Sequence, residues 1–412
     1  MGCHGGSRCL RFFVTTIVAV AGLAGLSTRS LASPLVVTPS AYLSEQYNDN
    51  IFFNDEHMDD YITNIGIGLS AQYSRPRFTA SLSSGTSAQY FAKNSSESGV
   101  AKNQAATLSM TYQASPILGL TLSDSLARVS STRTGSVLPA SEAPPNVEQP
   151  PPSTQASTLL PRGDAFSNYF ASGATYQFYP RWSAGLNYSN GVSDFTNPGG
   201  HELTNAVAGT LGYAWSPILG LSASFSYSRF SASQAPDTES YSPNAGFSYQ
   251  YDPTLSLGAY AGVYVNRPLG GGSDSISTGV GPTFSISLNK RFELSSVNLG
   301  GSQSVSNSAG VAGTSITDAA YLYYNVALSE HLSGSLGTSY SHFDTSQTNF
   351  DVLYVTAALS YPLWRYFSTG VSYSYVYRFA DQSTSTLNQG SVDDNLVQIY
   401  ISASYPVWRG DL

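Results

Sequence analysis

Residues 204–230 carry the pattern that most limits how this chain can fold. Alternate positions hold large apolar side chains and the positions between them hold small ones, first over 204–215 and again, after a turn at 216–218, over 219–228. Each run has about ten residues, the length that a tilted β-strand needs to cross a bilayer. Strands of soluble sandwiches are usually nearer 5–6 residues. The pattern therefore predicts a membrane-spanning β-hairpin.

Short turns and long polar segments alternate along the rest of the chain. The short turns combine an aromatic strand end with a proline or a polar pair, and the sequence Ser-Pro-Ile-Leu-Gly-Leu occurs identically from Ser115 and from Ser216. Proline suits tight turns because its φ is fixed and it has no N–H to pair. The longer segments include 194–203, 232–242 and 304–317. Short turns on one side and long loops on the other are typical of bacterial outer-membrane barrels.

The sequence thus predicts an all-β fold, a transmembrane antiparallel up-and-down β-barrel of about 18 strands, within a range of 16–20. An even strand number returns both termini to the periplasm. The unit recurs at roughly 40 residues, which is also the length of a propeller blade. A blade packs four short strands, however, whereas each period here shows two long ones.

Composition agrees with a barrel. Charged residues make up 11% of the chain, less than half of the roughly 25% usual in soluble domains. The mean hydropathy is −0.11, and after the N-terminus no run of apolar residues is long enough for a helical span. The net charge of −8 argues against a nucleic-acid partner.

Residues 1–32 have the features of a secretory signal peptide. Basic residues precede an apolar run over 12–26, and small residues end at Ala32, where we expect cleavage. Ala24 is a second candidate cleavage site, and a retained membrane anchor is the alternative interpretation. The expected mature protein is one domain, an outer-membrane β-barrel over 33–412.

Residues with recognisable chemistry are few. Both cysteines, Cys3 and Cys9, lie in the expected signal peptide, so we expect no disulfide, metal or cofactor site in the mature chain. The expected mature chain has four histidines and no nucleophile motif beside them. His331 falls at a short turn, and the other three lie in or beside the long polar segments: His57, His201 and His342. We therefore predict that the protein is not an enzyme and has no catalytic residues.

Tryptophan placement predicts a membrane interface. All four tryptophans fall at the short turns, as an aromatic girdle in contact with outer-membrane lipid would require: Trp182, Trp215, Trp364 and Trp408. One position fits badly, because Asp124 shares its parity with three leucines. A β-bulge or register break there would explain it.

The small polar side chains of the opposite parity are expected to line a wet lumen. Glu45, Tyr47 and Asp49 share one face of the first strand and are candidate lumen-facing residues. Their carboxylates could then pair with an arginine such as Arg128, Arg229 or Arg267. The alternative is a polar strand end that enters a loop. The proline-rich segment Ser130 to Ala165 is either a constriction folded into the lumen or a disordered external loop.

The stretch Tyr47-Asn48-Asp49-Asn50-Ile51-Phe52 follows the signal peptide and precedes long alternating strands. In this it resembles the β-barrel porins encoded with bacterial exopolysaccharide systems. The resemblance implies an outer-membrane channel for polysaccharide secretion, with a polysaccharide export apparatus as partner. The chain departs from many outer-membrane proteins in ending Trp408-Arg409-Gly410-Asp411-Leu412 instead of on an aromatic residue.

Exopolysaccharide secretion is therefore the predicted function. A general or sugar-selective diffusion porin is the first alternative, because a hydroxyl-lined lumen passes neutral glycans in either direction. A structural or adhesive barrel acting through its loops is the second.

Overall fold

The computed structural model describes residues 34–129, 164–195, 200–233, 235–269, 279–307, 314–345, 349–380 and 391–411. The predicted signal peptide and nearly all of the Ser130 to Ala165 segment lie outside these ranges. No helix among the described residues is long and apolar enough to span a membrane.

The described chain forms one antiparallel sheet that closes on itself. Its strands are β1 Pro34–Asn48, β2 Asp60–Arg75, β3 Phe78–Phe91, β4 Gly99–Ser115, β5 Leu118–Val129, β6 Ala165–Tyr179, β7 Trp182–Phe195, β8 Gly200–Ser216, β9 Leu219–Ala232 and β10 Ala235–Asp252. They continue with β11 Leu255–Leu269, β12 Gly279–Arg291, β13 Ser295–Asn307, β14 Thr314–Ala327, β15 Ser333–Thr345, β16 Asn349–Trp364, β17 Phe367–Ala380, β18 Val392–Ser404 and β19 Trp408–Asp411. A single 3-10 turn, η1 Ser95–Glu97, lies between β3 and β4.

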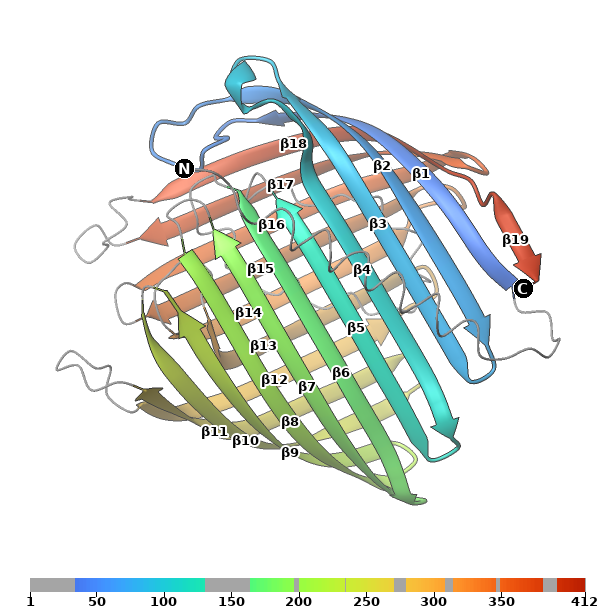
Figure 1. The fold of residues 1–412 in the computed structure, drawn as a ribbon, viewed down its shortest axis with the longest axis vertical. Coiled ribbons are helices and arrows are strands. Elements are labelled where there is room, and N and C mark those ends of the chain that lie inside the picture. The colour runs from blue at the N-terminus through green and yellow to red at the C-terminus, as the bar shows by residue number, and fades with distance from the viewer. Residues whose placement is uncertain are drawn as a thin grey trace.

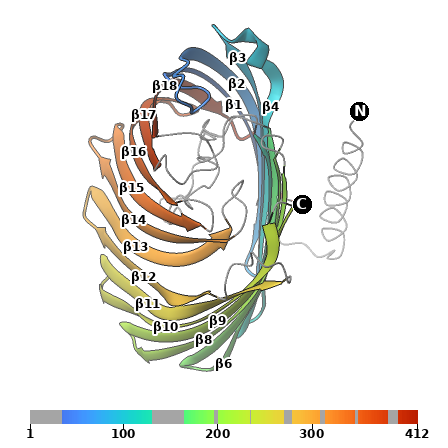
Figure 2. The ribbon, with the colours of Figure 1, turned by 90° about the vertical axis from the view of Figure 1, so that its left-hand side faces the viewer.

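Each strand pairs with its sequence neighbours, and β1 pairs with β18 to close the barrel. Figures 1 and 2 show the tilted strands wrapping into one wall. The short β19 pairs with the start of β1 and continues the line of β18 after a break at 405–407. The wall is thus the predicted 18-strand barrel, and the prediction of fold class is confirmed.

A repeated bulge shapes the short turns. In five hairpins the register shifts by one residue immediately before the turn, as between Gln113 and Ser115 or between Gln177 and Tyr179. Three of the five bulges follow a glutamine, and two of these side chains span the gap: Gln113 Nε2 donates to the Ser115 carbonyl at 2.6 Å, and Gln250 Nε2 donates to the Asp252 carbonyl at 2.5 Å. Bulges increase local twist, which helps the hairpins follow the curved wall. Around Asp124 the register is continuous, so the bulge predicted there is wrong.

Most strands are longer than the predicted length of about ten residues. All of them have 13–18 residues except β5 and β19, which are shorter, whereas about ten residues are enough to cross the bilayer. The segment 232–242, predicted as a long loop, is mostly strand: β9 ends at Ala232 and β10 begins at Ala235. Polar side chains there pair across the hairpin, as when Arg229 donates to Asp237 at 2.8 Å. The ladder therefore continues above the membrane belt.

Pairing fixes which side chains share a face, because residues directly opposite in an antiparallel pair point to the same side. Ser44 on β1 is buried and therefore points inward. Following the register from Ser44 through every strand pair assigns the residues of the wall to the inner or the outer face without conflict. The large apolar file of β8 and β9, with Leu211 and Phe225, lies on the outer face and is 42% and 51% exposed. The predicted separation into an apolar and a small polar face is present.

Candidate functional site: the barrel lumen and its mouth

The inner wall is built mainly from small neutral residues. Serine, threonine, glycine and alanine occupy most inward positions, as in the facing pairs Ser226 with Ser242 and Ser285 with Ser302. Inward charges along the described strands are few: Asp60, Glu202, Arg291, Arg378 and Asp394. Barrels of about this strand number leave an aqueous channel. The wall therefore offers hydroxyl and amide groups with little electrostatic preference.

Tyrosine rings lie over glycines on this inner face. At six directly opposed positions, a Cβ on the glycine would come within 2.8 Å or less of the tyrosine side chain, and at a seventh, Tyr169–Gly191, it would make an ordinary contact at 3.7 Å. These pairs are Tyr42–Gly66, Tyr169–Gly191, Tyr260–Gly246, Tyr264–Gly281, Tyr321–Gly300, Tyr323–Gly337 and Tyr400–Gly370. Without a Cβ, the glycine lets the ring lie against the wall. Aromatic faces are thereby spread around an otherwise small-residue lining.

One of these rings borders a hollow of about 270 Å³ in the inner wall between β5 and β8. Tyr169 is 53% exposed. Around it stand hydroxyl, amide and methyl groups, from Thr121, Ser123, Ala171, Asn187, Ser189, Ala206 and Ala208. A tyrosine face with neighbouring donors and acceptors suits a ligand that is apolar on one side and hydroxylated at its edge.

The stretch from Tyr47 to Phe52 closes the seam of the barrel. Asp49 Oδ1 and Oδ2 accept hydrogen bonds from the backbone N and the side-chain Nδ2 of Asn395, each at 2.7 Å. Asn50 Nδ2 donates to the Asp393 carbonyl at 2.9 Å, and the Asn48 side chain accepts from the Asn50 backbone N at 2.7 Å. These residues tie the end of β1 to the start of β18. Their polar character has a structural cause at the point where the two ends of the sheet meet.

The following segment, residues 50–58, folds onto the inner wall at the long-loop end. Phe53 is 2% exposed and packs among inward side chains of β15 to β18: Phe343, Phe350, Val352, Val376 and Val392. The Arg378 guanidinium lies 5.2 Å from the centre of the Phe53 ring. Phe53 has a φ of 51°, which costs about 1–2 kcal/mol for a non-glycine residue. Burial of a phenylalanine contributes about 1.5–3 kcal/mol and offsets this cost.

A second connection at the same mouth is held by Asp60, which is fully buried. Asp60 Oδ1 accepts from the Lys93 backbone N at 2.9 Å, and Oδ2 accepts from the backbone N and the Nδ2 of Asn94, each at 2.8 Å. These bonds fix the connection between β3 and β4 against β2. The Lys93 ammonium donates to Asp59 at 2.5 Å, and this hydrogen bond raises the pKa of Lys93.

The candidate lumen residues occupy a different place from the predicted one. Glu45 pairs in register with Ile399 and Thr63, and Tyr47 pairs with Val397 and Tyr61, so both share the apolar outer face. The inward residues of β1 are the intervening Ser44, Gln46 and Asn48, all buried. Asp49 is at the seam, as described above. Assignment of Glu45, Tyr47 and Asp49 to the lumen is therefore wrong, because the strand has the opposite facing.

The predicted arginine partners are also engaged elsewhere. Glu45 Oε2 accepts from the Thr63 hydroxyl at 2.7 Å. Arg128 pairs with Asp164 at 3.2 Å and Arg229 with Asp237 at 2.8 Å. Arg267 stands opposite Glu239 on the outer face.

The tryptophans lie near the short turns. Trp182 begins β7, Trp215 is next to the end of β8 and Trp364 ends β16; Trp215 and Trp364 are 61% and 75% exposed. Trp408 begins β19, opposite Val37 of β1. Their role as a lipid-interface girdle stays a prediction.

Two histidine–aspartate pairs lie on the outer face near the long-loop rim. His201 Nδ1 and Asp194 Oδ1 are 2.6 Å apart, as are His342 Nδ1 and Asp351 Oδ1. Both pairs are directly opposed on outward positions, away from the lumen. His57 Nε2 lies 3.6 Å from Asp393 Oδ1 at the seam. Within the described ranges, no group of three or more His, Cys, Asp or Glu side chains could hold a metal ion.

No protein-family model matches this chain, and no curated protein matches it. Solved outer-membrane barrels share its general fold. The outer membrane protein OpdK of Pseudomonas aeruginosa aligns at 12% identity and a TM-score of 0.45, covering 90% of this chain and 99% of that one. OccK3 (OpdO) of Pseudomonas aeruginosa aligns at 12% and 0.47 over 91% and 96%, and OccAB4 of Acinetobacter baumannii at 11% and 0.45 over 90% and 98%. With TM-scores below 0.5, these similarities assign no function to this chain.

Proposed function

We propose that this protein is a passive outer-membrane channel for neutral saccharides, acting as a general or sugar-selective diffusion porin. The observation that carries the proposal is the inner wall, where neutral hydroxyl and amide groups alternate with tyrosine rings seated over glycines. Pore selectivity follows from the donors, acceptors and charges that line the lumen. A wall with few charges accepts hydroxylated, uncharged solutes without repelling or trapping them.

The hollow beside Tyr169 is the site where such a solute would bind transiently. The exposed ring can stack against the C–H face of a sugar ring, while Asn187 and Ser189 offer an amide and a hydroxyl to its edge. Conduction needs binding weak enough to allow release, and one aromatic face with neutral hydrogen bonds is of this kind.

Secretion of an exopolysaccharide is the second candidate, since a neutral lumen would also admit a polysaccharide strand. The resemblance that favours it rests on the stretch from Tyr47 to Phe52. Those residues connect β1 to β18. Every closed barrel needs such a connection, whatever solute it transports. For this reason we rank diffusion of small saccharides above export.

Reconstitution into liposomes tests the proposal. Vesicles loaded with an impermeant polymer should swell quickly in isotonic solutions of neutral mono- and disaccharides. Swelling with a sugar acid and with an amino sugar of similar size should be about equally fast, because the wall has little electrostatic preference. No swelling with any sugar, or a strong preference for one sign of charge, would contradict a neutral-saccharide channel.

Gene deletion separates the two candidates. Slower growth on a limiting neutral saccharide with normal surface polysaccharide would support diffusion. Loss or periplasmic trapping of surface polysaccharide with normal sugar uptake would instead support export.

A further inference from the structure

A polar patch interrupts the apolar outer face between β5 and β8. Asn168 Nδ2 donates to Asp124 Oδ1 at 2.8 Å, and Asn190 Nδ2 donates to Asn205 Oδ1 at 2.9 Å. The Tyr188 hydroxyl donates to the same Asn205 oxygen at 3.1 Å. Their outward facing follows from the register, in which Asp124 stands opposite Leu108 and Phe170, and Asn190 opposite Phe170 and Asn205.

The patch begins at a height where the belt should be apolar. Asp124 is six residues beyond Leu118, the first residue of β5 after a short turn. At about 3.3 Å per residue and a tilt of about 40°, it lies roughly 15 Å above that turn, in a lipid-facing belt about 25 Å tall. Asn190, eight residues beyond Trp182, is roughly 20 Å up by the same measure. Carboxylates and amides at this depth are costly against hydrocarbon.

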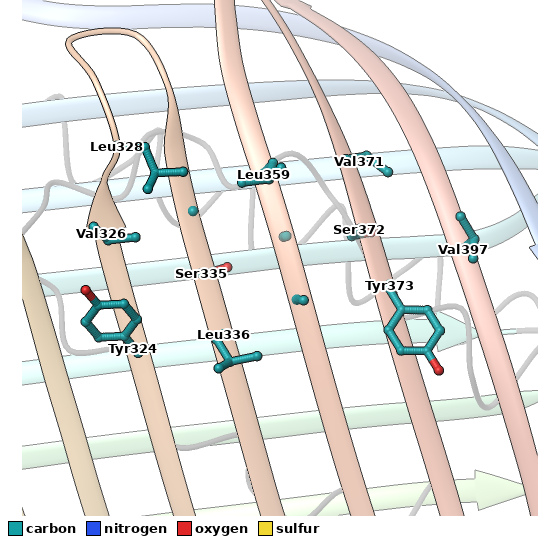
Figure 3. A pocket seen from close by; sticks show the side chains of 13 residues that line it. Tyr324, Val326, Leu328, Ser335, Leu336, Leu359, Val371, Ser372, Tyr373 and Val397 are labelled. Atoms are coloured by element: carbon teal, nitrogen blue, oxygen red, sulfur yellow. The ribbon is translucent and has the colours of Figure 1, made fainter.

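The opposite wall shows what lipid contact requires. At roughly 13–18 Å by the same measure, the outward side chains of β15 to β18 are uncharged, among them Thr338, Tyr340, Tyr373, Val397 and Ile399. A hollow of about 400 Å³ on the outer face of this wall is lined by apolar side chains, including those of Leu328, Leu359 and Val397 (Figure 3). The carboxylate of Asp124 therefore sets the outer face of β5 apart from that of β15 to β18 at this height.

Small side chains lie beside the patch, nearer the short turns. Ser172 stands opposite Tyr188, and Ala174 and Gly209 both stand opposite Leu186, all on the outer face. A Cβ on Gly209 would meet no atom within 4 Å. Small residues in a membrane face allow another polypeptide backbone to approach closely.

We propose that a second copy of this chain docks on the outer wall of β5 to β8, related to the first by a two-fold axis. Amides supply both donors and acceptors, so a patch of this composition is complementary to itself, as a two-fold interface demands. The small residues would let the two walls meet. Lipopolysaccharide phosphates are a poorer occupant: Asp124 would repel them, and the neighbouring Arg229 is paired with Asp237 at 2.8 Å.

Crosslinking in native membranes tests the proposal. Ser172→Cys in a full chain with Cys3 and Cys9 replaced should give a disulfide-linked or short-linker dimer of twice the chain mass. Thr338→Cys, outward on β15 opposite Val355, is the matched control and should stay monomeric. No dimer from S172C, equal dimer from T338C, or a crosslink to a different protein identified by mass spectrometry would overturn the second-copy interface.

Association in detergent gives an independent readout. Asp124→Leu and Ser172→Trp should each raise the concentration at which the dimer dissociates by at least tenfold in light scattering, whereas Thr338→Leu should not change it. Heat-modifiable migration on gels confirms that each variant forms a barrel. If both folded patch variants dimerise like the unaltered protein, or the unaltered protein is monomeric in membranes and detergent, the proposal is overturned.

Discussion

Replacing Leu211 with arginine should destabilise the barrel strongly, because Leu211 faces outward near the middle of the belt. It lies five residues before Ser216, the last residue of β8, which places it roughly 13 Å above the short turn at about 3.3 Å per residue and a tilt of about 40°. Arginine on a lipid face near the bilayer midplane costs about 2–4 kcal/mol. The folding equilibrium should fall by a factor of roughly 30–1,000, since about 1.4 kcal/mol is tenfold.

Ala208→Arg on the same strand is the matched control. Ala208 belongs to the inner face, where it lines the hollow beside Tyr169, so the new guanidinium should stay hydrated and cost less than about 1 kcal/mol. Trp215→Arg, at the short-turn rim, should also cost only about 0–1 kcal/mol for its charge, because the penalty falls towards the interface. Reversible urea unfolding in lipid vesicles, followed by protease protection, measures all three. Equal losses for Leu211→Arg and Ala208→Arg would refute the assignment of faces.

Three further substitutions test the mouth and the lining. Phe53→Ala should loosen the 50–58 segment from the inner wall by about 3–5 kcal/mol, which should appear as faster cleavage of this segment by an external protease. Unchanged cleavage would contradict the packing of Phe53 against β15 to β18. Asp60→Ala should cost about 3 kcal/mol, because the variant loses a buried carboxylate that accepts several hydrogen bonds. Hydrogen exchange at the backbone amides of Lys93 and Asn94 should accelerate. The control Asp59→Ala should leave this exchange unchanged. Gly66→Ala should cost about 1–3 kcal/mol, since its Cβ would overlap the Tyr42 ring; Tyr42→Ala should remove most of that penalty in the double variant, and additive losses would show that the ring is not the obstacle.

Much of the barrel could be read from periodicity because the two faces meet different solvents. On β8 and β9 the contrast is strong, so their facing was predictable. On β1 both files are polar near the seam, and the facing of Glu45 and Tyr47 was predicted wrongly. A signal was present in Leu43, which shares their parity, is 47% exposed and stands opposite Ile401.

Other features depend on pairing between distant strands. The bonds from Asp49 and Asn50 to β18 join residues almost 350 positions apart, so the polar cluster gave no hint of seam closure. The strand over 235–242 was read as loop because its polar side chains resemble loop composition, whereas they are satisfied across the hairpin with β9. The sequence predicted a bulge at Asp124 because this residue shares its parity with three leucines. The register around Asp124 is regular, so the presence of a carboxylate on the outer face must be explained by what surrounds that face.

Single-channel recording with saccharide titration tests the central claim most directly. Purified full-length protein in a planar bilayer should conduct with weak ion selectivity, and neutral oligosaccharides should cause brief, concentration-dependent interruptions of the current. Tyr169→Ala should shorten these interruptions at least several-fold and leave open conductance unchanged, while Tyr176→Ala, on the outer face of the same strand, should alter neither. Strong anion or cation selectivity with no effect of neutral saccharides would contradict a neutral, tyrosine-studded sugar channel.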